Sequence, residues 1–144
     1  VYSNCDEVQL TVNGRRLARK KMPKNGHLEW EAVYKPGYVK AIGYKGGRKV
    51  METRIETTGA AEEAVWTYET VGDIMIANVA MHDAKGRFVP TANCPVEFPA
   101  PEGWRILGWG NGDPAFQHDE RPEGGADTIS ITTFNGLAQV ILQK

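Results

Sequence analysis

The sequence lacks any long apolar run and any excess of charge of one sign. None of its apolar stretches approaches the ~18 residues that a membrane-spanning helix needs, so no membrane span is expected. Lys and Arg number 17 and Asp and Glu 18, which gives a formal net charge of -1. A general nucleic-acid binder carries a basic excess. We therefore expect no nucleic-acid partner.

Residues that act as nucleophiles are scarce. The only serines are Ser3 and Ser130, there are three histidines, and no Gly-x-Ser-x-Gly motif occurs. A nucleophilic site needs a base beside its Ser or Cys, so an acyl-transfer site is not expected. The glycine-dense run 108–112 leads into Asp113-Pro114 and not into a helix, unlike a phosphate-binding loop. The sequence thus predicts no catalytic residue and no cofactor.

The two cysteines, Cys5 and Cys94, lie far apart in the sequence. A disulfide framework would need an even set of cysteines at short spacings, and a zinc site would need further Cys or His residues nearby. Two separate and mostly buried thiols are favoured, because free cysteine is usually buried. A single bridge between the two halves of the chain stays open.

What the sequence does contain is period-two alternation, which predicts short β-strands. Val8, Leu10 and Val12 alternate with polar residues, and Asn13-Gly14 follows at once. Both turn residues tolerate the positive φ of a tight hairpin turn. Further strands are expected in the first half over 16–22, 27–34, 38–45 and 48–57.

The segment 27–34 carries Leu28, Trp30, Ala32 and Tyr34 on one face of its expected strand. A tryptophan in such a pattern is typical of a sandwich core, since large aromatic side chains dominate cores. Packing is therefore favoured over sugar stacking for Trp30.

The second half repeats this style with different spacing. The run 57–63 is small and polar, with no strand pattern, and indicates a boundary near Gly59. Asp83 to Gly86 reads as a turn with glycine at its last position, and Asn135-Gly136 predicts a final hairpin. Strands are expected over 64–68, 74–82, 87–89, 104–109, 128–134 and 137–143.

Many short strands with turns every eight to twelve residues indicate an all-β fold. We expect two small Ig-like β-sandwich domains in tandem, 1–58 and 59–144. The halves share no sequence period, so they are not a tandem repeat. A domain near 60 residues buries only ~60% of its unfolded surface. The first domain is therefore expected to be marginal alone. Because residues 1–4 look like the end of a strand that runs into a turn, this domain is also expected to be truncated at its N-terminus.

One loop region gathers candidate binding residues. Planar aromatic rings match the apolar face of a pyranose, which makes Trp109, Asn111, Asp113 and His118 weak candidates for carbohydrate binding. Oxygen ligands in the same region would suit Ca²⁺, but their spacing matches no known calcium loop. A solvated acidic loop is the commoner explanation, and no metal site is predicted. The acidic and amide residues weighed for calcium, beside His118, are Asn111, Asp113, Asp119, Glu120 and Asp127.

Paired carboxylates are the groups that glycoside hydrolysis needs. The pairs Asp6/Glu7 and Glu62/Glu63 are adjacent in sequence, so in a strand their side chains point to opposite faces. A turn or surface role is favoured over catalysis for both pairs.

Several runs together resemble a known family. Residues 1–14, VYSNCDEVQLTVNG, resemble the opening of the small β-sandwich that follows the catalytic barrel in many bacterial family 2 glycoside hydrolases of the β-galactosidase type. A basic strand, here 15–21, follows in that family as well. Similar segments of this family occur in the same order at 37–44 (GYVKAIGY), 83–92 (DAKGRFVPTA), 108–114 (GWGNGDP) and 134–138 (FNGLA).

The resemblance implies a supporting role. In that family the catalytic glutamates sit on a (β/α)₈ barrel, and no residue of this sequence matches those motifs. The chain is accordingly expected to be the non-catalytic C-terminal portion of a periplasmic or secreted glycosidase. Its implied partners are the catalytic barrel and other sandwich domains of the parent chain. The alternatives are a carbohydrate-binding module, which would take carbohydrate as its partner, and a cell-surface Ig-like spacer.

Overall fold

The computed structural model describes residues 1–115 and 127–144. The chain divides into two compact units, Val1–Thr57 (unit 1) and Thr58–Lys144 (unit 2). Each unit is described by itself below. The two domains expected over 1–58 and 59–144 stay a prediction, because compactness alone does not show that each part folds independently.

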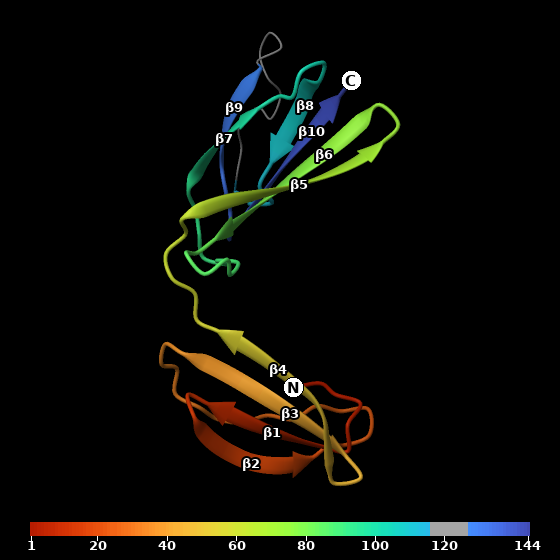
Figure 1. The fold of residues 1–144 in the computed structure, drawn as a ribbon, viewed down its shortest axis with the longest axis vertical. Coiled ribbons are helices and arrows are strands. Elements are labelled where there is room, and N and C mark those ends of the chain that lie inside the picture. Colours follow the sequence, from red (N-terminus) through yellow and green to blue (C-terminus); the bar gives the residue numbers. More distant parts are fainter. Residues whose placement is uncertain (116–126) are drawn as a thin grey trace. The chain divides into compact units, whose positions relative to one another are not determined.

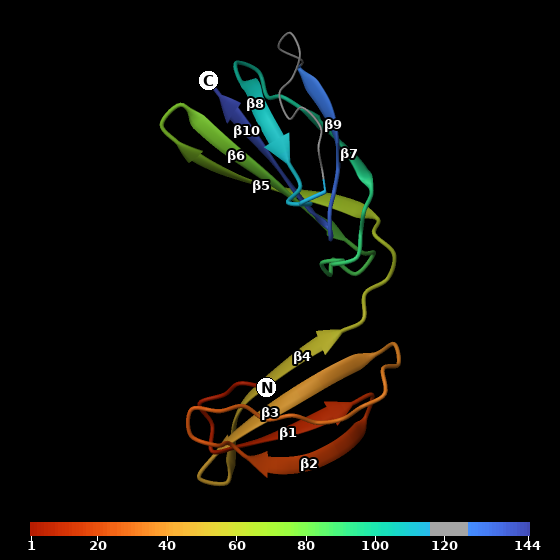
Figure 2. The ribbon, with the colours of Figure 1, turned by 180° about the vertical axis from the view of Figure 1, so that it is seen from behind.

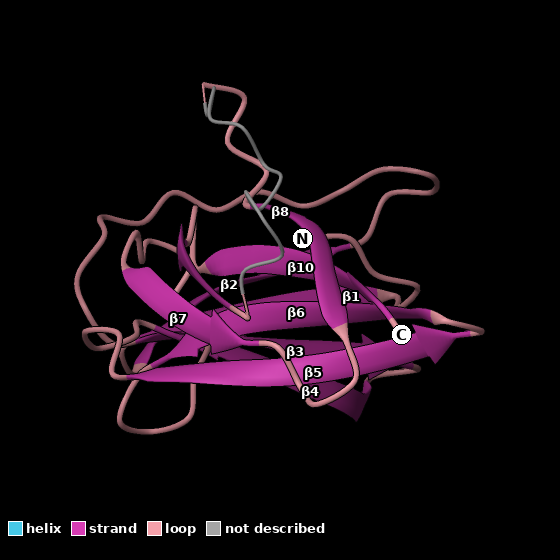
Figure 3. Cartoon of the chain, turned by 90° about the horizontal axis from the view of Figure 1, so that it is seen from above, coloured by secondary structure: helices cyan, strands magenta, loops and turns pink. Residues whose placement is uncertain are grey.

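All regular structure in the described residues is β-strand, and no helix is present there (Figure 3). Every ladder is antiparallel, as short turns between successive strands favour. The predicted all-β class is thus confirmed. The strands are β1 (Glu7–Val12), β2 (Arg15–Lys21), β3 (Tyr38–Lys45), β4 (Arg48–Glu56), β5 (Glu63–Val71), β6 (Ile74–His82), β7 (Pro95–Pro99), β8 (Arg105–Gly110), β9 (Thr128–Thr132) and β10 (Leu137–Gln143).

Unit 1 contains one four-stranded sheet in the order β2-β1-β3-β4 (Figure 1). Asn13-Gly14 joins β1 to β2, with φ of 48° and 84°, values that only glycine and a few residues such as asparagine adopt readily. Gly46-Gly47 joins β3 to β4 in the same way, with φ of 53° and 77°. The first hairpin lies where the sequence predicts it, and the second joins the strands expected over 38–45 and 48–57.

The two faces of this sheet differ in character. Val8 and Leu10 of β1 are buried, and they lie opposite Gly43 and Ala41 of β3. These residues define the apolar face of the sheet. On the other face, Glu7 pairs with Arg19 at 2.5 Å across β1–β2. Lys40 of β3 and Glu52 of β4 form a second cross-strand ion pair on that face, which is therefore charged.

The expected strand over 27–34 is wrong as regular structure, because this segment forms no ladder. Leu28 is nevertheless buried, as its alternation predicts, and Trp30 is half-buried, whereas Ala32 and Tyr34 of the same predicted face are exposed. Alternation reports which side chains face a core, whereas a strand also requires a neighbouring backbone to pair with. Only Leu28 finds such a partner, at Val1.

Unit 2 contains two sheets, a four-stranded one in the order β5-β6-β10-β8 and a two-stranded one of β7 and β9. Figures 1 and 2 show β7 and β9 together, separate from the larger sheet. Buried side chains from both sheets pack against each other, which is the arrangement of a β-sandwich. The buried apolar residues are Ala77, Val79, Met81, Val89, Ala92, Val96, Phe98, Ile106, Ile129, Ile131, Ala138, Val140 and Leu142.

Asn135-Gly136 makes a tight turn but not the predicted hairpin. Phe134 and Leu137 exchange both backbone hydrogen bonds, at 2.9 and 3.1 Å, and the strands then separate. β9 pairs with β7, whereas β10 lies between β6 and β8. The turn therefore carries the chain from the two-stranded sheet to the four-stranded sheet, so that β9 and β10 contribute apolar side chains to the core from different layers. The expected strand over 87–89 is likewise reduced to a single bridge between His82 and Phe88.

Candidate functional site

Trp109 is held in β8 as part of the sandwich interior. It lies directly opposite Val140 of β10, whose side chain is fully buried. Directly opposed residues share one face of a sheet, so the indole points inward. Trp109 packs against both groups of buried residues in unit 2 while remaining half-buried. Its principal contacts are therefore apolar packing contacts.

Asn111 and Asp113 shape the backbone of the loop that follows β8. Asn111 donates its Nδ2 to the carbonyl oxygen of Thr132 at 2.8 Å, and its Oδ1 accepts from the backbone N–H of Asp113 at 2.9 Å. Asp113 Oδ1 in turn accepts from the N–H of Ala115 at 2.9 Å. Such side-chain to backbone bonds are typical of Asx turns. The structure thus brings Trp109, Asn111 and Asp113 to one end of β8.

His118, the fourth predicted binding residue, lies outside the described residues. The same holds for Asp119 and Glu120, which were weighed as calcium ligands. Among the residues that the structure does describe, no group of three or more His, Cys, Asp or Glu side chains could hold a metal ion.

Asp83 is the most elaborately bonded carboxylate of the described chain. It is buried, and its Oδ2 accepts from Arg87 Nη2 at 2.6 Å and from the Gly59 N–H at 2.8 Å. Its Oδ1 accepts from the N–H groups of Lys85 and Arg87 at 2.9 and 3.0 Å. A carboxylate with this many donors is fixed in its ionised form.

These bonds set the pKa of Asp83. The Arg87 guanidinium, and after it the Gly59 N–H, holds the pKa of this carboxyl well below its usual range. A general acid or base needs a pKa near the working pH, so this shift is in the wrong direction for proton transfer. Asp83 is therefore a structural group that closes the 83–87 turn and ties residue 59 to it.

The charged face of unit 1 contains a smaller example. Lys49 donates a 2.6 Å hydrogen bond to Glu52, and Lys40 lies 3.5 Å from the other carboxylate oxygen of Glu52. These two cations lower the pKa of Glu52, Lys49 most strongly. Because all three side chains are partly exposed, the pairing contributes little to stability.

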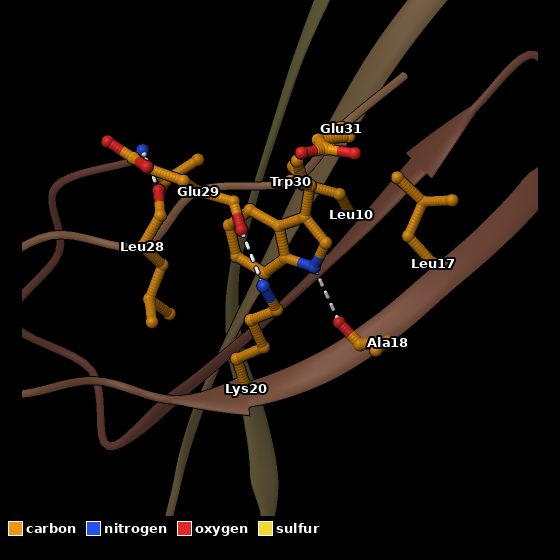
Figure 4. A pocket seen from close by; sticks show the side chains of 9 residues that line it. Leu10, Leu17, Ala18, Lys20, Leu28, Glu29, Trp30 and Glu31 are labelled. Atoms are coloured by element: carbon orange, nitrogen blue, oxygen red, sulfur yellow. Dashed lines mark hydrogen bonds between the residues drawn. The ribbon is translucent and has the colours of Figure 1, made fainter.

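Unit 1 contains a pocket of about 880 Å³ between its sheet and the segment that follows β2 (Figure 4). The Trp30 indole donates to the Ala18 carbonyl oxygen at 2.7 Å, and Lys20 Nζ donates to the Glu29 carbonyl oxygen at 2.6 Å. Lys20 also lies 5.2 Å from the centre of the Trp30 ring, within cation–π range. The pocket lining consists of Val1, Leu10, Leu17, Ala18, Lys20, Leu28, Glu29, Trp30 and Glu31.

Sequence reasoning missed this pocket, although it identified the alternation of Leu28 and Trp30. Its charged members, Lys20, Glu29 and Glu31, look like ordinary surface residues in the sequence. No local pattern reports that the 22–37 segment folds back along β2. The burial of Asp83 was also missed, although Arg87 four residues later was an available signal.

Both cysteines are free, Cys5 buried in unit 1 and Cys94 half-buried in unit 2. Among the adjacent carboxylates, Asp6 accepts a hydrogen bond from the Gly46 N–H at 2.7 Å, and Glu7 pairs with Arg19. Within residues 1–115 and 127–144 we find no helix with the length and apolarity of a membrane span.

Comparison with known proteins identifies relatives over nearly the whole chain. Residues 1–51 match the family described as "Domain of unknown function (DUF4982)". A β-galactosidase of Bacteroides ovatus is 32% identical over 150 residues, covering 99% of this chain and 17% of the relative. A β-glucuronidase of Formosa agariphila is 31% identical, covering 79% of this chain and 13% of the relative. The chain thus spans less than a fifth of the length of these two relatives.

Solved structures with the same fold are also glycosidases. A glycosyl hydrolase family 2 member from Bacteroides cellulosilyticus matches with a TM-score of 0.82 and 24% identity, over 99% of this chain and 19% of that one. A β-glycosidase from Bacteroides vulgatus matches with a TM-score of 0.77, also at 24% identity, over 99% of this chain and 18% of that one. The expected resemblance is confirmed: over nearly its whole length, the chain is related in sequence and fold to a segment of family 2 β-galactosidase and β-glucuronidase enzymes.

Proposed function

We propose that this chain is a non-catalytic accessory portion of a β-galactosidase-like glycoside hydrolase, placed C-terminal to the catalytic (β/α)₈ barrel. The observation that carries the proposal is the match of 99% of this chain to only 17% of a β-galactosidase. Such a portion supports the barrel and the other sandwich domains, and contributes to substrate-cleft or oligomer contacts. Since the relatives are bacterial, we propose the periplasm or the exterior of the cell as its compartment.

The use of the chemical groups in unit 2 supports a structural role. The Asp83 carboxylate accepts hydrogen bonds from the backbone N–H groups of residues 59, 85 and 87. The Asn111 amide and the Asp113 carboxylate are likewise hydrogen-bonded to backbone groups, those of Thr132 and Ala115. A glycosidase site needs two carboxylates placed across a substrate bond, one of them with a raised pKa. The Asp83 pKa is shifted the opposite way.

Turnover tests the non-catalytic part of the proposal. We expect the 144-residue chain to release no nitrophenol from nitrophenyl β-galactoside or nitrophenyl β-glucuronide. Real turnover by the purified chain would overturn the claim that it has no active site.

The supporting role is tested in the complete parent enzyme with Leu142→Ala. Leu142 is fully buried, and removing such a side chain costs about 2–5 kcal/mol. We expect faster thermal inactivation of the parent with kcat/KM almost unchanged at ambient temperature. Ile141→Ala is the matched control, since Ile141 is the partly exposed neighbour. Equal inactivation rates for the parent and both variants would contradict a supporting role.

The alternative is a carbohydrate-binding module built on Trp109, Asn111, Asp113 and His118. The observation in its favour is that the structure brings Trp109, Asn111 and Asp113 to one end of β8. Titration of the chain with galactosides and polysaccharides, followed by tryptophan fluorescence, tests it. A saturable response that Trp109→Ala removes would favour the module, and a flat response would eliminate it. A spacer role would be favoured by further sandwich repeats in the parent gene and no barrel.

A further inference from the structure

Residues 28–34 of unit 1 form a segment with strand-like alternation in sequence and with open backbone N–H groups on both of its edges. The N–H groups of residues 29–35 donate no hydrogen bond to any described part of the chain. Leu28 is the exception, because its N–H donates to the Val1 carbonyl oxygen at 3.0 Å. An alternating segment with free N–H groups is a template for a further strand.

The pair formed by Val1 and Leu28 fixes the direction and register of that strand. The Val1 nitrogen donates to the Leu28 carbonyl oxygen at 2.7 Å, so the two residues exchange both backbone hydrogen bonds. This is the hydrogen-bonded pair of an antiparallel ladder, which recurs every second residue. The N–H groups of Trp30, Ala32 and Tyr34 therefore belong to the same edge as Leu28. The Glu29 carbonyl oxygen, bonded to Lys20, belongs to the opposite edge.

The apolar face of the unit 1 sheet is covered over only half its width. Val8 and Leu10 of β1 are 2% and 9% exposed. On the β3–β4 half, Val39 and Ile55 lie opposite each other and are 44% and 75% exposed, and Met51 is 50% exposed. Cys5 passes over this half, since its Sγ would lie 2.5 Å from a Cβ at Gly43. The chain between Val1 and Cys5 thus approaches the uncovered part of the face.

We propose that residues 28–34 accept an antiparallel β-strand that runs into Val1, supplied by the polypeptide that leads into Val1 in a longer parent protein. This inference rests on the proposed function, in which the chain is a portion of a larger enzyme. The added strand pairs with Trp30, Ala32 and Tyr34, and its alternate side chains cover the β3–β4 half of the apolar face. Unit 1 then becomes a two-layered sandwich.

Continuity with the existing pair favours this occupant over a second copy or a separate partner. The Val1–Leu28 pair is the last pair of the proposed ladder. Because Val1 is already in register with Leu28, the residues immediately before Val1 can continue the same strand along 30–34 without a connecting loop. An intramolecular strand also pays no loss of translational and rotational freedom, unlike a strand from another molecule. A strand from another molecule could not pair with Leu28, because Val1 already occupies that position.

Amide hydrogen exchange in the complete parent protein tests the proposal. We expect the amides of Trp30, Ala32 and Tyr34 to exchange about 100-fold or more slowly in the parent than in the 144-residue chain, as ladder amides do. The amides of Glu31 and Val33, on the opposite edge, serve as internal controls. Equal rates for Trp30, Ala32 and Tyr34 in the two proteins would overturn the proposal, as would a parent that has no residues before Val1.

Proline substitution separates the two edges. Ala32→Pro removes an N–H that the added strand needs, and Val33→Pro removes one that it does not need. We expect Ala32→Pro to abolish the protection of Trp30 and Tyr34 in the parent, and Val33→Pro to preserve it. Equal effects of both variants would contradict the register. Protection that appears in the 144-residue chain only as it dimerises would assign the edge to a second copy and overturn the proposal.

The outcome is distinguishable from failure of the proposed function. If the parent hydrolyses glycosides and these amides stay unprotected, only the added strand is wrong. If the isolated chain turns over nitrophenyl glycosides while the parent shows the protection, only the non-catalytic role is wrong.

Discussion

At the scale of single residues, the charge of Asp83 stabilises a turn. Its carboxylate accepts hydrogen bonds from Gly59, Lys85 and Arg87. The backbone N–H groups of Lys85 and Arg87 bond to this carboxylate, and to no backbone carbonyl of the described residues. A buried carboxylate survives only when donors surround it. The stability of the turn is therefore coupled to the ionisation of one group.

The pH dependence follows from the direction of the Asp83 pKa shift. Because Arg87 lowers the pKa in the folded state below the usual value of 3.8, the folded state prefers the ionised form. The stabilisation is fully present above pH ~4 and is lost as the pH falls through the lower folded pKa. We expect Asp83→Asn to lower the free energy of unfolding at pH 7, measured by urea denaturation.

The difference between Asp83→Asn and the wild type should shrink as the pH falls below ~4. Glu97→Gln, at an exposed position of β7, is the control and should leave the free energy of unfolding nearly unchanged. A difference between wild type and Asp83→Asn that stays constant from pH 7 to below pH 3 would contradict the assigned coupling.

Gly43 is a second residue whose identity is forced by its surroundings. A Cβ built there would lie 2.5 Å from Cys5 Sγ and 2.9 Å from Met51 Cγ. We expect Gly43→Ala to destabilise unit 1 by about 1–3 kcal/mol through overpacking, measured by denaturant unfolding. Adding Cys5→Ala removes the nearer clash, so the two changes should be strongly non-additive.

Gly59→Ala is the matched control for Gly43→Ala. A Cβ at Gly59 meets nothing closer than 3.7 Å, which is ordinary van der Waals contact, so its effect should be within ~0.5 kcal/mol. Strict additivity of Gly43→Ala and Cys5→Ala would show that the clash is relieved elsewhere.

At the scale of the strand pairs, two turns with similar backbone angles lie in different surroundings. Gly14 and Gly136 have φ of 84° and 81°, and each follows an asparagine of positive φ. At Gly14 the turn is open to solvent, with no atom within 4 Å of an added Cβ. At Gly136 an added Cβ would lie 2.3 Å from the Val89 carbonyl oxygen. The crossing turn is thus packed against its own unit.

This contrast predicts unequal costs for the same substitution. Gly14→Ala should cost about 1–2 kcal/mol, the price of a left-handed backbone for a residue with a Cβ. Gly136→Ala should cost about 1–3 kcal/mol more, because backbone must also move. Amide hydrogen exchange in β1 and β2 would measure the loss of stability in unit 1, and exchange in β9 and β10 the loss in unit 2. Equal losses would mean that the Val89 contact is not rigid.

The sequence predicts the strands far better than their partners. Alternation and turn residues are local, so β6 and β10 agree with the predicted ranges 74–82 and 137–143. The partner of a strand depends on distant residues, and so Asn135-Gly136 was read as a hairpin although β9 pairs with β7. The same limit explains 27–34, where the burial of Leu28 was predicted, whereas the exposure of Tyr34 and the absence of a ladder were not.

The candidate site shows a related limit. The chemistry of Asn111 and Asp113 could be named from the sequence, but their bonds to loop backbone could not. A side chain that shapes a turn and one that binds a sugar carry the same polar atoms. Trp109 lies opposite the fully buried Val140 because β8 pairs with β10, and that pairing cannot be read from the local sequence.

At the scale of the whole molecule, the near-neutral charge conceals a strong division. Unit 1 has 12 Lys and Arg against 6 Asp and Glu, a net charge of +6, whereas unit 2 has 5 against 12, a net of -7. The two values sum to the -1 of the chain. Average composition therefore gives a poor description of the field around either unit.

The division predicts association that salt weakens. Near the isoelectric point of 6.3, repulsion between copies is minimal and unit 1 of one copy attracts unit 2 of another. We expect light scattering to detect association at ~0.01 M salt, where the Debye length is ~30 Å, and to lose it at ~0.15 M, where the length is ~8 Å. Association that salt leaves unchanged would point to apolar contact instead.

The position of β10 has a mechanical consequence. This last strand is bonded along its length to β6 on one side and to β8 on the other, and its Val140 and Leu142 side chains are fully buried. A pull on Lys144 along the strand axis would load both ladders in shear, so their bonds would have to fail together. Tension that enters through the C-terminal end of the chain would thus first load an inner strand that is bonded on both sides.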